Sequence, residues 1–310
     1  MLSRRGSFWP FIFILIFSFL TCSWQVNAGL HRENAKITLE HLSIAGNAIC
    51  DFRGNSVGVT IPLKRAGRLF LLEGTINNIV GNFILDTGAS GLVLNTTYFR
   101  NAIIVDDEEG GGVTGSTATV ARTNIKQLSV SDLIYTNVSA DVTPLGHLEN
   151  RRGVKILGLF GMSLPKNLEM VIDLRNNELQ IFKLDKNGNR AGTSSPTVKY
   201  DIVQKISEVQ NVMFVKATIG GKMLDFCLDT GAESNVISIN SSKQVMNTVT
   251  ITRRSGLSGV GENRGEVLYG TLNEFHMGTM RMVPMETIVC SLTAMSRKYG
   301  SLQKEKFILI

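Results

Sequence analysis

Apolar and polar residues alternate in nearly the same pattern along two separate stretches of this chain. The first, residues 68–95, reads "RLFLLEGTINNIVGNFILDTGASGLVLN", and the second, residues 212–238, reads "VMFVKATIGGKMLDFCLDTGAESNVIS". This pattern predicts, in each stretch, a strand, a tight turn and a second strand that ends at an aspartate. The turn dipeptides, Asn77-Asn78 and Gly220-Gly221, can adopt the positive φ that two-residue hairpins need.

A polar, glycine-rich segment follows each repeated hairpin, at residues 106–120 and 255–267. Glycine clusters suit mobile hairpin tips, and their recurrence after both repeats favours a substrate-covering flap over a plain surface loop. Helical periodicity is nearly absent, and only residues 162–170 suggest a short helix, so the chain is predicted to be mainly β. The predicted flap residues are Gly111, Gly112, Val113, Gly259, Val260 and Gly261.

The repeat also predicts the domain organisation. The five expected parts are an export signal (1–28), extra strands that pack on the first lobe (29–67), the first lobe (68–185), a linker (186–198) and the second lobe (199–310). The linker is rich in Gly, Asn and Ser, as flexible connections are.

The first 28 residues have the anatomy of a cleavable export signal. Arg4 and Arg5 are followed by an uncharged run at residues 8–20 and by small residues at a cleavage site, Val26 to Ala28. The run is short for a stable membrane span, so we expect a periplasmic or secreted protein. An uncleaved membrane anchor is the alternative, and only this segment would then contact the membrane.

Composition and charge exclude several classes of function. The chain is 43% hydrophobic and 19% charged, which suits a globular core and argues against extensive disorder. The formal net charge is +6, and no block of Lys and Arg with interleaved aromatics supports nucleic-acid binding. The four His are scattered, and Cys50, Cys227 and Cys290 show no CxxC spacing, so we expect no metal site. The sequence leaves open whether Cys50 and Cys290 form a disulfide.

The two Asp-Thr-Gly motifs place Asp86 and Asp229 at the ends of apolar strands, 143 positions apart. A buried carboxylate is costly unless it is paired or hydrogen-bonded. If the repeats pack about a pseudo-two-fold axis, the two carboxyl groups can meet there, share a proton and activate a water between them. The residues expected to support them are Thr87 and Thr230, bonded across the axis, and Gly88 and Gly231, which allow close backbone approach.

These motifs resemble those of the aspartic proteases. In that family two adjacent aspartates share one proton. The retropepsin-like branch fits better than the pepsin-like branch, because Ala89 and Ala232 follow the motifs where pepsin-like lobes usually carry Ser. The resemblance covers roughly residues 68–310. It implies an all-β, two-lobed fold with pseudo-two-fold symmetry, Asp86 and Asp229 as the catalytic dyad, a polypeptide substrate and no cofactor or metal.

In this family a hydrophobic-hydrophobic-Gly strand threads behind the catalytic loop, and a short helix follows it. The first repeat matches at Ile156, Leu157 and Gly158, whereas the second reaches the corresponding point at Ile310, without the Gly, the helix or a final strand. Two interpretations stay open: the sequence is part of a longer product, or the second lobe is incomplete at its C-terminus. Whether the chain pairs with itself, as a homodimer, to complete that lobe is also open.

Three functional hypotheses follow from these observations. The first is an exported aspartic endopeptidase that uses Asp86 and Asp229, and the second is a non-catalytic peptide-binding module on the same scaffold. The third is a structural protein of the cell envelope in which both motifs are plain turns. Only the third requires that the two aspartates lie far apart in space.

Overall fold

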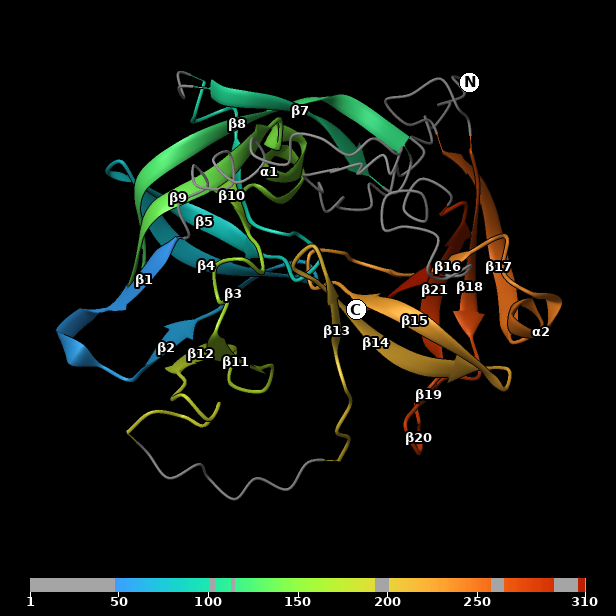
Figure 1. The fold of residues 1–310 in the computed structure, drawn as a ribbon. Helices are drawn as coiled ribbons and strands as arrows, with labels where there is room; N and C mark the ends of the chain where they lie inside the picture. Colours follow the sequence, from blue (N-terminus) through green and yellow to red (C-terminus); the bar gives the residue numbers. More distant parts are fainter. Residues whose placement is uncertain are drawn as a thin grey trace, which may run out of the picture.

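Three β-sheets make up most of the chain, which the computed structural model describes over residues 48–100, 104–112, 115–192, 201–257, 265–292 and 306–309. Figure 1 shows two lobes side by side, the first in blue to green and the second in orange to red. The first contains a nine-stranded sheet and the second a ten-stranded sheet. The predicted all-β class is confirmed, and the α-helices among these residues are two short ones, α1 (Gly146–Arg152) and α2 (Lys243–Met246).

The strands of the first half are β1 (Ile49–Phe52), β2 (Gly58–Pro62), β3 (Lys64–Ala66), β4 (Leu69–Ile76), β5 (Ile79–Leu85), β6 (Leu92–Asn95), β7 (Ile104–Gly112), β8 (Gly115–Val130), β9 (Leu133–Thr143), β10 (Ile156–Phe160), β11 (Leu168–Asp173) and β12 (Glu178–Lys183). A 3-10 turn, Arg53–Asn55, follows β1. The nine-stranded sheet has the order β1-β9-β6-β10-β5-β4-β8-β7, with β3 beside β4. The third sheet, β11-β12-β2, lies at the foot of this lobe (Figure 1).

The strands of the second half are β13 (Ser207–Val209), β14 (Val212–Ile219), β15 (Lys222–Leu228), β16 (Asn235–Ser238), β17 (Val249–Leu257), β18 (Gly265–Leu272), β19 (His276–Met277), β20 (Met280–Arg281), β21 (Met285–Cys290) and β22 (Lys306–Leu309). Their sheet has the order β17-β18-β21-β16-β22-β15-β14-β19-β20, with β13 beside β14.

The two lobes repeat one pairing pattern. In the first lobe β10 runs parallel to β5 and antiparallel to β6, so it lies between the two strands that flank Asp86. In the second lobe β22 lies in the same way between β15 and β16, the strands that flank Asp229. The strand that was expected near Ile310 is therefore formed by Lys306–Leu309, although it has no glycine where β10 has Gly158.

Alternate residues of the repeated strands enter two hydrophobic clusters, because successive side chains of a strand point to opposite faces of the sheet. One cluster of the first lobe contains Leu69, Leu71 and Ile84, and its counterpart in the second lobe contains Val212, Phe214 and Cys227. The cluster on the other face contains Leu72, Ile76 and Phe83 in the first lobe, and Val215, Ile219 and Phe226 in the second. The internal repeat of the sequence is thus a repeat of the core.

The predicted hairpin turns are confirmed. Asn77 and Asn78 have φ values of 49° and 64°, and Gly220 and Gly221 have values of 56° and 75°. Two successive positive φ values match the right-handed twist of the strands on either side. The turns therefore fix the register of β4 with β5 and of β14 with β15.

The predicted helix at residues 162–170 is wrong. The chain turns over residues 162–167, where Asn167 has a φ of 61°, and then enters β11. A helix forms earlier instead, at α1, and ends at Gly153, whose φ of 64° lets its N–H donate to Glu149 O over 2.8 Å.

The strands that precede β4 all join the first half of the chain. β1 pairs with β9, β2 with β12, and β3 with β4. The export segment, residues 1–28, lies outside the described residues, as do residues 193–198 of the expected linker. Within the described part of the chain, no helix has the length and apolar character needed to cross a membrane.

Candidate active site

The two Asp-Thr-Gly loops occupy equivalent places in the two lobes. Asp86 follows the last residue of β5, and Asp229 follows the last residue of β15. Both side chains are buried, with exposed fractions of 0% and 1%. The apolar strands on either side of each loop pack into the lobe cores and carry both acids inward.

Two threonines join the loops across the boundary between the lobes. The Thr87 hydroxyl donates to Leu228 O over 2.7 Å, and the Thr230 hydroxyl donates to Leu85 O over 2.7 Å. Each hydroxyl oxygen also accepts the backbone N–H of the other threonine, at 3.2 Å from Thr87 N and 3.0 Å from Thr230 N. These four reciprocal bonds satisfy buried backbone groups on both sides and fix the loops against each other.

Two glycines bring each backbone against the carboxyl group of the other repeat. A Cβ added to Gly88 would lie 2.5 Å from Asp229 Cγ, and one added to Gly231 would lie 2.3 Å from Asp86 Cγ. Only a residue without a side chain fits at these distances. The two aspartates therefore lie close together, and the hypothesis of a structural protein with distant aspartates is wrong.

Each carboxyl group accepts two backbone N–H bonds from its own loop. Asp86 Oδ1 accepts from Gly88 and Ala89 over 2.9 and 3.1 Å, and Asp229 Oδ1 accepts from Gly231 and Ala232 over the same distances. Asp86 Oδ2 is buried and accepts no hydrogen bond from a fixed N–H or O–H donor among the described residues. Asp229 can donate to Asp86 only when it carries a proton.

Burial raises the pKa values of both acids. It raises the pKa of Asp86 to about 6, although a hydrogen bond from Asp229 and the N–H groups of its own loop lower it. Burial, the negative charge of Asp86 and the hydrogen bond to Asp86 raise the pKa of Asp229 well above its ordinary value. Two adjacent buried carboxyl groups titrate as a unit. The geometry favours one proton shared between the two carboxyl groups.

The residues of the supporting strand that contact the Asp86 loop lie three positions later in the chain than expected from the sequence. Asp86 N donates to Phe160 O over 3.1 Å, and Met162 N donates to Ala89 O over 2.9 Å. A Cβ added to Gly161 would lie 2.2 Å from Gly91 O. The "LFG" of residues 159–161 therefore supports the loop directly, whereas Gly158 packs against Val93 O, where a Cβ would lie only 1.9 Å away. Two consecutive hydrophobic-hydrophobic-Gly triplets, residues 156–158 and 159–161, gave the signal, and the structure distinguishes them.

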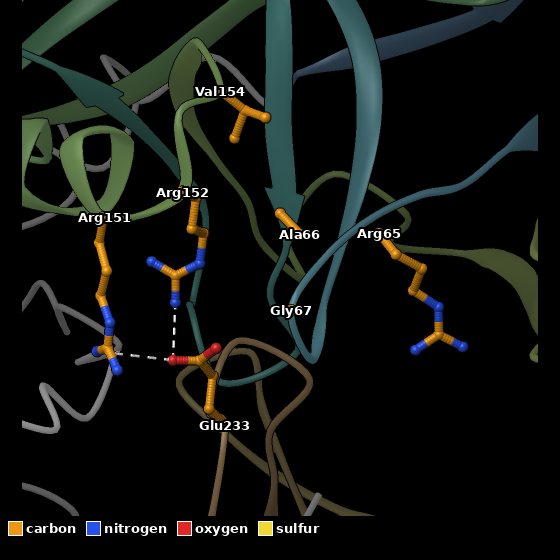
Figure 2. A pocket seen from close by; sticks show the side chains of 7 residues that line it. All are labelled: Arg65, Ala66, Gly67, Arg151, Arg152, Val154 and Glu233. Carbon is orange, nitrogen blue, oxygen red and sulfur yellow. Dashed lines mark ion pairs between the residues drawn. The ribbon is translucent and has the colours of Figure 1, made fainter.

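Charged side chains at the boundary of the lobes were not found from the sequence. A pocket of about 410 Å³ lies there. In Figure 2, Arg151 and Arg152, at the end of α1, point toward Glu233 of the second lobe. Glu233 follows Asp229 by four positions. Its pairing with α1 has no local signature, because the partners are about 80 residues apart in the chain.

The flap residues predicted from the sequence are placed only in part. Gly111 and Gly112 end β7, whose hairpin with β8 lies over the first lobe in Figure 1, and Val113, Gly259, Val260 and Gly261 lie outside the described residues. Cys50, Cys227 and Cys290 form no disulfide among the described residues, and Cys227 is buried. No three His, Cys, Asp or Glu side chains gather as a metal site in the part of the chain that the structure describes.

The sequence profile of one protein family, described as aspartyl protease, matches residues 72–164. Residues 72–164, within the first repeat, are therefore similar to the aspartyl protease family. This match confirms the resemblance to retropepsin-like proteases. It covers the Asp86 loop, the β7–β8 hairpin and the supporting strand β10, all within one protease repeat.

Two other comparisons add little to the family match. The crystal structure of a retropepsin-like aspartic protease from Rickettsia conorii matches with 20% sequence identity and a TM-score of 0.30, over 44% of this chain and 94% of that chain. A search of curated proteins found no match.

Proposed function

We propose that this protein is an aspartic endopeptidase that hydrolyses peptide bonds with a water activated by Asp86 and Asp229. One observation carries the proposal: two buried acids from separate repeats lie against each other, held by a symmetric set of hydrogen bonds. The match of the first repeat to the aspartyl protease family supports the same reaction. The sequence of residues 1–28 supports export across a membrane, followed by cleavage of the signal.

The different proton affinities of the two acids suggest their separate roles. Asp86 has the lower pKa, about 6, so it would be the carboxylate that takes a proton from the attacking water. Asp229 holds its proton more strongly and would donate it toward the carbonyl oxygen of the peptide bond. Since this mechanism needs one proton on the pair, we expect activity to decline as the pH falls below about 6.

The substrate that fits this site is a polypeptide in extended conformation. An extended peptide can add to the edge of a sheet through its backbone, which leaves sequence preference to side-chain pockets. The two long hairpins, β7–β8 and β17–β18, lie at one end of the strand order of their sheets, and we propose that they cover such a strand. Their glycine-rich tips, with the predicted flap residues, are proposed to close over it.

Replacement of each aspartate by asparagine tests this proposal, because the amide keeps the shape of the side chain and removes the acid. We expect Asp86→Asn and Asp229→Asn each to lower the cleavage rate of an unfolded protein by at least about 100-fold. Asp225→Asn is the matched control, since Asp225 is buried in β15 four positions before Asp229 but pairs with Lys216. Undiminished cleavage by either dyad variant would rule out the mechanism.

A non-catalytic peptide-binding module remains the alternative function. It predicts that the wild-type protein binds unfolded polypeptide without producing fragments at mildly acidic and at neutral pH. Fragments that the wild type produces and the asparagine variants do not would exclude this alternative.

A further inference from the structure

The symmetry of the two active-site loops ends one position after the alanine. The first loop continues with Ser90 and the second, at the equivalent position, with Glu233. Ser90 O accepts the N–H of Ser163, in its own lobe, over 2.9 Å. Glu233 instead reaches across to the first lobe, so only one of the two loops carries an acidic side chain at this point.

The Glu233 side chain is paired with the end of α1. Arg152 Nη2 lies 2.7 Å from Glu233 Oε2, and Arg151 Nη1 lies 4.0 Å from the same oxygen (Figure 2). The Arg152 side chain is only 6% exposed and that of Glu233 18%. An ion pair removed from water in this way is short and weakly screened, and the loss of one partner leaves a buried charge without compensation.

Two further contacts hold the same residue, one at its backbone and one at its side chain. Arg68 Nη1 donates to Glu233 O over 3.1 Å, and Gly67 lies so close that an added Cβ would be 3.2 Å from Glu233 Oε1. Arg152 is itself held, because its Nη1 donates to Leu148 O in α1. Glu233 is therefore fixed at both its side chain and its backbone by the first lobe.

The ion pair connects the supports of both aspartates. On one side, Ala232, directly before Glu233, donates its N–H to Asp229 Oδ1. On the other side, Arg152 ends the helix that leads into β10, and the last residue of β10, Phe160, accepts the N–H of Asp86. A shift of the pair would therefore be transmitted to the separation of the two carboxyl groups.

We propose that Glu233 and Arg152 are positioning residues that hold the Asp229 loop against the first lobe at the distance catalysis needs. This inference rests on the proposed peptidase function. The asymmetry has a physical reason: a single chain needs only one such pair across its lobe boundary, because the threonine bonds already serve both loops equally.

The test is Glu233→Gln, which keeps the size of the side chain and removes its charge. A small misplacement of reacting groups lowers the rate strongly, so we expect kcat to fall by about 10- to 100-fold while KM changes little. The matched control is Glu73→Gln, which breaks the Lys64–Glu73 pair, also 2.7 Å long but more than half exposed and within the first lobe. Its kcat should stay at the wild-type value, as exposed pairs contribute little.

A second measurement does not depend on catalysis. Hydrogen exchange of residues 229–234 should be faster in Glu233→Gln than in wild type, because the bonds of Gly231 and Ala232 to Asp229 loosen, while residues 64–76 should exchange as before. Unchanged exchange at 229–234, or unchanged kcat, overturns the proposal. If the wild type shows no peptidase activity, the proposed function fails, and hydrogen exchange still decides whether the pair fixes the loop.

The charge-reversed double variant, Arg152→Glu with Glu233→Arg, separates positioning from folding. If it recovers much of the kcat and of the exchange protection lost in Glu233→Gln, the pair itself is responsible. If both Glu233→Gln and the double variant fail to fold, the pair serves folding in general, and the positioning role is wrong.

Discussion

The two repeats share a strand pattern although their sequences have diverged. β10 lies between β5 and β6 in the first, and β22 lies between β15 and β16 in the second, with the same parallel and antiparallel pairings. Yet β10 contains Gly158 against Val93 O, whereas Phe307 takes the equivalent register position in β22. The comparison teaches that the place of this strand depends on backbone pairing with its neighbours, not on one glycine.

The repeats differ most in the strands and helices that each adds to the shared strand pattern. The first gains β1, β2, β11 and β12, which cover one of its hydrophobic clusters, and the second gains α2 and the short strands β19 and β20. The family match is confined to residues 72–164, in the first repeat. The active-site loops are nevertheless alike to within 0.2 Å in their hydrogen-bond lengths. Divergence is thus tolerated in the periphery and restricted where the lobes meet.

The glycines offer the strongest test of equivalence between the loops. Gly88→Ala and Gly231→Ala would each force a Cβ into the carboxyl group of the opposite repeat. We expect both to lower kcat/KM by about 100-fold or more, because the aspartates are pushed out of place. Gly146→Ala is the control, since its Cβ would make an ordinary 3.4 Å contact with Thr97 Oγ1. A loss in only one of the two variants would show that the loops are not equivalent.

The pH dependence of stability should show that the folded protein holds protons on the two acids more tightly than the unfolded chain does. A pKa of Asp86 raised from 3.8 to about 6 means that the folded state binds this proton more tightly than the unfolded state does. The corresponding stabilisation is present below about pH 4 and is lost as the pH rises through 6, with a total of about 3 kcal/mol.

Asp86→Asn and Asp229→Asn should therefore each show a weaker pH dependence than the wild type when the free energy of unfolding is measured by urea at several pH values. Each variant keeps one buried acid whose pKa burial raises, so its stability should still decrease as the pH rises above about 4. A stability that stays constant from about pH 4 to 7 in either variant would show that the remaining acid does not hold its proton more tightly in the folded state.

The hydrogen bonds of Thr87 and Thr230 across the lobe boundary predict that replacing either threonine lowers stability by the same, smaller amount. Thr87→Val and Thr230→Val each remove a hydroxyl that donates over 2.7 Å and accepts an N–H from the other loop. Buried backbone groups then lose their partners, and we expect each variant to lose about 1–3 kcal/mol of unfolding free energy. Serine at either position keeps the hydroxyl and should restore most of it. Unequal losses in thermal or urea unfolding would mean that one lobe relies on the bridge more than the other.

The smallest expected effect concerns equivalent positions that already differ. Asn82 in β5 corresponds to Asp225 in β15, where Lys216 Nζ lies 3.1 Å from Asp225 Oδ1. Since the lysine side chain is 55% exposed, the pair is screened, and Asp225→Asn should cost less than about 1 kcal/mol. A larger loss, measured by urea unfolding, would show that the second lobe needs the charge that the first lobe does without.

Local patterns predicted the repeated elements well, because their causes are local. The alternation of apolar residues gave the paired strands, and Asn77-Asn78 and Gly220-Gly221 gave the turns, since positive φ depends on the residue itself. The prediction of a helix at 162–170 was wrong because it relied on weak periodicity alone. Local turn geometry after Gly161 and the positive φ of Asn167 form a turn there instead. The supporting triplet was ambiguous in sequence, as both Gly158 and Gly161 are sterically required.

By itself, the sequence determined that two equivalent strand–turn–strand units exist and that each ends in an aspartate. Alternation, turn chemistry and the Asp-Thr-Gly motif all lie within a few neighbouring residues. Only the tertiary structure decided that the two acids lie against each other, that burial raises the pKa values of both, and that Glu233 binds Arg152. Those properties depend on burial and on distances between residues remote in the chain, and the packing of the two lobes alone sets such distances.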